Sequence, residues 1–328
     1  MTNLDVAAGW PLTRAQVRAA RWTLHPANPL IAPPWPSPIL ADPTFVLPAH
    51  SPDGRWHLFA HSLWGIHHFV SADSLHWQRS RWLHRNALRP CLYWDESGYT
   101  LLYERARRGR LPLHWLPGRR WYSWIEMIHS ADLQTWSEPT VLLTPALAWH
   151  GGPAGQAVSN PCLLRADGVY RLYYSAGLQF LADCGFNEPA AIGLAQATNL
   201  RGPYTPLAEP LLRPDPTRRW ANLAAGAMKV RRVADGWVAF QNGIYWDEAA
   251  RHSGSAIVLL DSADGLHWQE ALPTPLLAPG AGWLRSHVYA LDVHYAAAAG
   301  LFYLYFNARD DWHWTQGRER IGLLLGQA

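Results

Sequence analysis

The sequence predicts an all-β protein: a five-bladed β-propeller of four-stranded antiparallel blades, preceded by a short N-terminal helix. Two repeats and one compositional feature lead to this prediction. A heptapeptide recurs as SADSLHW (71–77), SADLQTW (130–136) and SADGLHW (262–268). A glycine hairpin followed by an aromatic-rich strand recurs five times, and 20 tryptophans are available as packing anchors. Repeats of this length are typical of radial β-architectures.

The two repeated turns define one structural unit. The heptapeptide lies between two extended stretches, so it predicts a tight turn whose closing Trp packs on the sheet. The glycine hairpins lie in SPDGRWHLFAH (51–61), WDESGYTLLYE (94–104), RADGVYRLYYS (165–175), VADGWVAFQNG (233–243) and YAAAAGLFYLYFN (295–307). The unit is therefore strand A, glycine turn, strand B, variable loop, strand C, SAD-type turn and strand D. ATNLRGPY (197–204) replaces the heptapeptide in the third unit, and GRERIGLLLG (317–326) ends the fifth.

The spacing of the repeats sets the expected blade boundaries. First strands are expected near 42–48, 90–94, 161–165, 227–233 and 288–295. The blades would then span about 40–83, 88–143, 158–212, 224–277 and 286–326, with unequal loop insertions explaining the uneven distances. Residues 1–35 are expected to form a tail with one helix at about 13–21. The alternative is a pair of β-sandwiches, in which the strands would not recur in groups of four.

Charge and cysteine content exclude several classes of protein. A net charge of +3 over 328 residues implies no polyanionic partner. The basic run 105–110 predicts a solvated loop rather than a nucleic-acid surface, because no nucleic-acid-binding motif accompanies it. Three widely spaced cysteines, Cys91, Cys162 and Cys184, form neither a disulfide framework nor a zinc ribbon. With no secretory signal and no membrane-length apolar run, the expected location is cytoplasmic, with no membrane partner.

Propeller geometry sorts the loops onto two faces. The A–B and C–D turns share one face and are short and repetitive, whereas the D–A and B–C connections share the other and are irregular and polar. The second face is therefore the expected ligand face. Asp42, in ILADPTF (39–45), begins the first inner strand and is expected to direct its carboxylate into the central funnel. The alternative is that Asp42 only caps a turn before Pro43.

The chain resembles a known family in its first-blade motif and in its repeated corners. ILADPTF (39–45), GRWHLFAH (54–61) and the repeated strand–turn–Trp corners are similar to the five-bladed propeller glycoside hydrolases of family 43 and the related families 32 and 68. The resemblance implies that Asp42 is a general base, aided by a second-blade Asp and a third-blade Glu acid. The chain departs from this pattern, because Arg89 and Asn160 occupy the second- and third-blade positions.

Hydrolysis of a glycoside needs one protonated and one ionised carboxyl group, so another residue must supply the acid. Glu188, in CGFNEPAAIG, is the first candidate and Glu104, in LLYERA, the second. The alternative for each is an ion pair that fixes a loop. Glu319, between two arginines, is interpreted as a salt-bridged structural residue.

The same face carries side chains suited to a polyol. Amides, guanidinium groups and carboxylates bond vicinal hydroxyls, and Trp or Tyr rings stack on sugar faces, although blade packing explains each ring equally well. The expected substrate-binding residues are His61, Trp64, His67, His68, Arg89, Asn160, Asp183, Gln241, Asn242, Tyr245, His287, Asp292, Asn307, Arg309 and Asp310. The histidine spacing fits no standard metal motif, so no metal and no cofactor is expected.

These observations predict a glycosidase that cleaves a small glycoside or oligosaccharide by general acid–base catalysis, with inversion expected. Two alternatives stay open. One is a carbohydrate-binding propeller without catalysis, favoured by the missing second-blade Asp and third-blade Glu. The other is sugar transfer or phosphorolysis, with Arg89, Arg105 or Arg309 holding an anion. The loops are too polar for a protein-interaction scaffold, and the sequence does not address oligomeric state.

Overall fold

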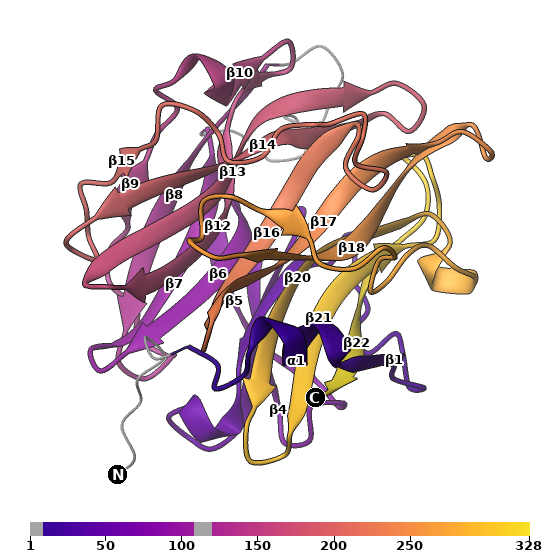
Figure 1. Cartoon of the computed structure of the whole chain (residues 1–328). Helices are drawn as coiled ribbons and strands as arrows, with labels where there is room; N and C mark the ends of the chain where they lie inside the picture. The colour runs from indigo at the N-terminus through magenta and orange to yellow at the C-terminus, as the bar shows by residue number, and fades with distance from the viewer. Residues whose placement is uncertain (1–8, 108–119) are drawn as a thin grey trace.

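The computed structural model describes residues 9–107 and 120–328, and in these residues β-strands dominate (Figure 1). The all-β prediction is confirmed. Residues 108–110, the last part of the basic run, and residues 1–8 of the expected tail lie outside the described residues. Among the described helices, none is long and apolar enough to cross a membrane.

The strands form five antiparallel units, and in the first four the strands follow chain order from the inside outwards. The first comprises β2 (Ala41–Val46), β3 (Trp56–Ser62), β4 (Gly65–Ser71) and β5 (Gln78–Arg85). The second comprises β6 (Ala87–Asp95), β7 (Gly98–Ala106), β8 (Trp121–Ser130) and β9 (Thr140–Leu143), extended by β10 (Gly151–Gly152) and β11 (Gly155–Gln156). The third comprises β12 (Val158–Ala166), β13 (Val169–Leu181), β14 (Phe186–Ala197) and β15 (Thr205–Pro206). The fourth comprises β16 (Ala224–Val233), β17 (Gly236–Asp247), β18 (His252–Ser262) and β19 (Gln269–Glu270). The fifth comprises β20 (His287–Ala296), β21 (Leu301–Arg309) and β22 (Glu319–Gln327), completed by β1 (Arg21–Leu24).

The first strands of the five units make a closed ring. Strand β2 contacts β6, β6 contacts β12, β12 contacts β16, β16 contacts β20, and β20 returns to β2. Each inner strand begins within a few residues of its expected position. We interpret the five units as the five blades, which leaves short outer strands at the sheet edges.

The N-terminal segment differs from the expected free tail. Helix α1 (Arg14–Ala19) begins with a capping box between Thr13 and Gln16, close to the expected helix. The chain then continues directly into β1, which pairs antiparallel with β22 and lies beside it in Figure 1. The fifth unit therefore takes its outer strand from the start of the chain. Sequence periodicity missed this strand because its four residues carry neither repeated turn.

The repeated heptapeptide forms the same hydrogen-bonded turn each time. In the first copy, Asp73 Oδ1 accepts hydrogen bonds from the backbone N–H groups of Leu75 and His76, at 2.9 and 2.8 Å, and Ser71 Oγ donates to the same oxygen at 3.0 Å. Asp132 and Asp264 make the equivalent bonds. The closing residues Trp77, Trp136 and Trp268 each pack against a hydrophobic core cluster. The predicted turn with a Trp anchor is confirmed.

Beneath the ligand face, one buried polar network connects all five inner strands. Thr44 Oγ1 on β2 accepts from the Leu92 backbone N–H of β6 at 2.9 Å and donates to Asp292 Oδ2 of β20 at 2.6 Å. Arg231 Nη2 of β16 donates to Asp292 Oδ1 at 2.6 Å. Lys229 Nζ, also on β16, donates to the Pro161 carbonyl oxygen of β12 at 3.0 Å. Asp292, which the sequence predicted to bind substrate, is instead the centre of this network.

Replacing Asp292 by Asn should destabilise the protein strongly. The change leaves Arg231 and Lys229 buried without their shared counter-charge, which we expect to lower the free energy of unfolding by about 3–5 kcal/mol. Urea denaturation would measure it. The control is Asp167→Asn, because Asp167 forms an exposed pair with Arg232 at 2.8 Å, and its loss should change stability much less. Equal losses in the two variants would contradict the role given to Asp292.

Candidate active site

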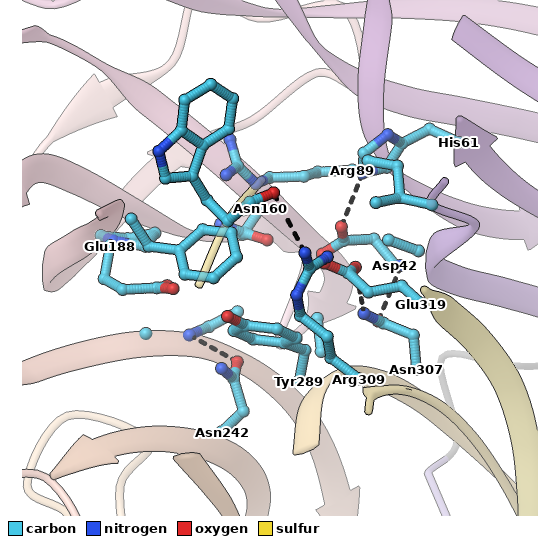
Figure 2. Close-up of a pocket in the computed structure, with 18 of the residues that line it drawn as sticks. Asp42, His61, Arg89, Asn160, Glu188, Asn242, Tyr289, Asn307, Arg309 and Glu319 are labelled. Atoms are coloured by element: carbon cyan, nitrogen blue, oxygen red, sulfur yellow. Dashed lines mark hydrogen bonds and ion pairs between the residues drawn. The ribbon is translucent and has the colours of Figure 1, made fainter. Parts of the chain in front are cut away.

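A cavity of about 370 Å³ opens where the inner strands begin (Figure 2). It is lined by starts of inner strands, such as Asp42 and Asn160, by the start of β14 with Glu188, and by a B–C connection with Trp314. The expected ligand face is therefore the face that carries this cavity. Its volume is in the range of sites that enclose small molecules.

A repeated backbone feature places side chains in the cavity. In every unit the inner strand carries one extra residue relative to its neighbour, between Ala41 and Thr44 in the first unit and at the equivalent point in the other four. Such a bulge redirects a side chain. Asp42, Arg89, Asn160 and Gly226 occupy these bulges with positive φ angles of 52°, 51°, 45° and 66°. A left-handed conformation is unfavourable for the three residues other than glycine, so the surrounding structure must hold it.

Asp42 is held as an ionised carboxylate. Its Oδ2 lies 2.8 Å from His61 Nε2, and His61 Nδ1 lies 3.1 Å from the Ser62 carbonyl oxygen. Both ring nitrogens of His61 thus lie within hydrogen-bonding distance of oxygen atoms. Burial alone would raise the pKa of Asp42, but the hydrogen bond and charge of His61, with the charges of Arg89 and Lys229, hold that pKa below its ordinary value.

Glu188 lies on the opposite side of the cavity from Asp42, at the start of β14 (Figure 2). It pairs in register with Gln179 in the long β13–β14 hairpin. Burial raises the pKa of Glu188 to about 7; Arg89 opposes this rise, and Glu319 and Asp42 add to it. The pKa of Asp42 is therefore lowered and that of Glu188 raised. Burial also raises the pKa of Glu319, a further carboxyl group of the cavity, although the charge of Arg309 opposes this rise.

A third carboxyl group, Glu319 at the start of β22, also lines the cavity. It accepts from Asn307 Nδ2 at 3.1 Å and from Arg309 Nη1 at 3.2 Å. Asn307 Oδ1 in turn accepts the backbone N–H of Asp42 at 2.9 Å. Glu319 is salt-bridged, as the sequence predicted, but through Asn307 it also supports the strained backbone of Asp42.

Glu104, the second candidate acid, is fully buried and does not line the cavity. Its carboxylate forms an ion pair with Arg89 and accepts from Trp121 Nε1 at 2.9 Å. This is the ion pair that the sequence analysis kept as its alternative, and it orients Arg89, whose side chain does line the cavity.

The structure brings some of the predicted residues together and not others. Residues that line the cavity are Asp42, His61, Arg89, Asn160, Glu188, Asn242, Asn307 and Arg309. Residues placed elsewhere are Trp64, His67, His68, Glu104, Asp183, Gln241, Tyr245, His287, Asp292 and Asp310. Gln241 illustrates one reason: successive strand residues face opposite sides, so when Asn242 faces the cavity Gln241 cannot.

The residues outside the cavity have structural partners of their own. His67 bonds Ser62 Oγ at 2.8 Å, and His68 bonds His57 at 2.9 Å. Asp183 accepts from Ser253, Gln241 donates to the Ala225 carbonyl oxygen, and Asp310 pairs with Arg320. Tyr245 packs edge-on against Trp220, His287 stacks on Tyr289, and Trp64 is 36% exposed in the β3–β4 turn.

The sequence analysis missed Phe186 and Tyr289 as lining residues, and it interpreted Glu319 as structural although that residue also lines the cavity. Tyr289 occupies the fifth bulge, in SHVYALD, so aligning the five inner strands on Asp42 could have found it. Phe186 begins β14 directly after a B–C connection, where no repeat fixes the position of a residue. Among the described residues, no group of three or more His, Cys, Asp or Glu side chains is arranged to hold a metal ion.

Comparisons with known proteins give similarity in structure only. No protein-family model matches the chain, and no curated protein matches its sequence. A solved N-acetylgalactosamine deacetylase from F. plautii, in complex with blood group B trisaccharide, is similar with a TM-score of 0.62 and 14% identity, over 87% of this chain and 89% of that one. A structure from the GH130 family, described as containing glycoside hydrolases that target β-1,2 mannosidic linkages in Candida mannan, gives 0.61 and 14% over 93% of each chain. An exo-1,5-α-L-arabinanase from a bovine ruminal metagenomic library gives 0.56 and 13%, over 87% and 92%. At these identities the similarity establishes the fold that this chain shares with them.

Proposed function

We propose that the protein is a glycoside hydrolase that cleaves a small glycoside or oligosaccharide in the axial cavity, with Asp42 as general base and Glu188 as general acid. The observation that carries this proposal is the pair of carboxyl groups in one cavity, whose pKa values move in opposite directions. Such a separation assigns acid and base roles in carboxyl-dependent enzymes. That the solved structures of similar fold act on carbohydrates supports it. A place in or near family 43 is part of the proposal.

Each carboxyl group has one task. Asp42, kept ionised by His61, takes a proton from the attacking water, and Glu188 gives its proton to the glycosidic oxygen as the bond to the sugar breaks. The amide and guanidinium groups of Asn160, Asn242 and Arg89 line the same cavity and can bond sugar hydroxyls.

Phosphorolysis is a weaker candidate. The three arginines considered as anion-binding groups all have carboxylate partners: Arg89 pairs with Glu104, Arg105 with Glu126 and Arg309 with Glu319. A phosphate ion would have to compete with these bonds. Two results on the wild type would contradict the proposal. One is turnover that depends on phosphate. The other is affinity for a sugar without turnover of any aryl glycoside or oligosaccharide tested.

Removing either carboxyl group should reduce hydrolysis of a panel of aryl glycosides and oligosaccharides. We expect Asp42→Asn and Glu188→Gln each to lower kcat/KM by about 10²–10⁴-fold. The loss in Glu188→Gln should shrink for aryl glycosides with acidic leaving groups, which depart without a proton, whereas the loss in Asp42→Asn should not. Asp310→Asn, outside the cavity, is the control and should keep full activity. Unchanged turnover in Asp42→Asn would refute the assignment.

The pH dependence of kcat/KM should report both groups. The base must be ionised, so activity falls as pH drops through the lowered pKa of Asp42, below its ordinary value of 3.8. The acid must be protonated, so activity falls as pH rises above about 7. We expect a plateau between these limits and, in Glu188→Gln, loss of the alkaline limb from the residual activity. An alkaline limb at the same pH in that variant would assign it to another group.

The expected inversion at the anomeric carbon can be observed directly. Proton NMR of the first product formed should show the anomer opposite to that of the substrate, before mutarotation equilibrates the two. The substrate anomer as first product would indicate a covalent intermediate instead.

A further inference from the structure

Tyr289 occupies the fifth of the equivalent bulge positions. It lies on β20 between Val288 and Leu291, where the inner strand carries its extra residue, as Asp42 does on β2. Its side chain lines the cavity, and Figure 2 shows the hydroxyl directed toward the side on which Glu188 lies. The bulge that presents the base in the first unit therefore presents a phenol in the last.

The environment of Tyr289 fixes the ring but leaves the hydroxyl available. The ring stacks on His287, with centroids 5.2 Å apart and planes 2° apart, and meets Phe186 edge-on at 6.0 Å. The hydroxyl oxygen is buried and has no hydrogen bond of standard geometry within the described residues. A buried hydroxyl without a partner is unfavourable, so such a group calls for an explanation.

We propose that Tyr289 is a positioning residue for Glu188: its hydroxyl donates a hydrogen bond to the carboxylate that Glu188 becomes once its proton has passed to the glycosidic oxygen. This inference rests on the proposed function. In the step, the Glu188 O–H bond and the glycosidic C–O bond break, a bond from water oxygen to the sugar carbon forms, and a water proton passes to Asp42. Tyr289 keeps its own proton. Hydrogen bonds of this kind are often long in unliganded enzymes and tighten in the complex.

The charges around Glu188 show why a neutral donor is useful there. The groups that act on its carboxyl are Arg89 of β6, Glu319 of β22, Asp42 of β2 and Tyr289. The two carboxylates oppose ionisation of Glu188, and Arg89 is already bound to Glu104. Tyr289 lowers the pKa of Glu188, which is the effect expected of a donor that favours the ionised form. Burial and the nearby Glu188 and Glu319 hold the pKa of Tyr289 itself well above its ordinary value, so the phenol stays a donor at working pH.

The test is Tyr289→Phe, which removes the hydroxyl and keeps the ring. The carboxyl pKa of Glu188 can be read by carbon-13 NMR of protein labelled at glutamate side chains, with Glu188→Gln assigning the resonance. We expect that pKa to rise by about 0.4–1 unit in Tyr289→Phe, the equivalent of one hydrogen bond. Tyr174→Phe is the control, because Tyr174 bonds His150 at 2.9 Å outside the cavity. It should leave the Glu188 resonance unchanged.

A second readout uses turnover. In Tyr289→Phe the alkaline limb of kcat/KM should move up in pH by the same amount, and kcat should fall most for glycosides with poor leaving groups. An unchanged Glu188 pKa overturns the inference, even if Glu188→Gln abolishes hydrolysis. If the Glu188 pKa rises in Tyr289→Phe but the wild type hydrolyses no glycoside, the contact between Tyr289 and Glu188 is supported and the proposed function is refuted. The NMR result thus separates the two failures.

Discussion

The buried network centred on Asp292 is the constraint on which the rest of the structure depends. Thr44, Asp292, Arg231 and Lys229 connect the five inner strands across the axis through side chains and backbone groups. Each blade is a small antiparallel sheet that cannot bury its inner edge alone, and only closure of the ring removes that edge from water. Charged groups on the axis are stable there because each finds a partner on a neighbouring strand. The network also closes the ring at one level, directly beneath the cavity.

Above that level, the inner-strand bulges bring different side chains into one cavity. The same departure from register recurs in every unit, but the residue in it changes from Asp42 to Arg89, Asn160 and Tyr289. Four chemically different side chains thereby enter one cavity from equivalent positions. The positive φ angles at Asp42, Arg89 and Asn160 are unfavourable, and the amide of Asn307 holds the first of them by accepting the Asp42 N–H. Such strain at a cavity is expected where the precise direction of a side chain matters.

Two carboxyl groups in this cavity differ in pKa because their neighbours differ. Burial alone would raise the pKa of Asp42. The hydrogen bond and charge of His61, with the charges of Arg89 and Lys229, outweigh that effect and lower the pKa. Burial raises the pKa of Glu188, and Glu319 and Asp42 add to this rise. The opposing charge of Arg89, which is paired with Glu104, does not outweigh burial. The two pKa shifts follow from the groups around each carboxyl and not from the difference between Asp and Glu. The chemical roles therefore come from the packing around each group.

The sequence by itself determined the architecture and the position of Asp42. Repeated turns with short-range signatures, such as the Asp73 turn and the glycine hairpins, specify local strand pairs, and their recurrence indicates a radial fold. Those signals are local, so they can be read along the chain. Tertiary structure decided what depends on distant segments: the pairing of β1 with β22, the placement of Asp292 in the axial network, and the separation of Gln241 from Asn242 by strand alternation. It also decided that Glu188 rather than Glu104 enters the cavity, because a carboxyl group acquires its role from partners such as Arg89 that only the folded chain brings to it.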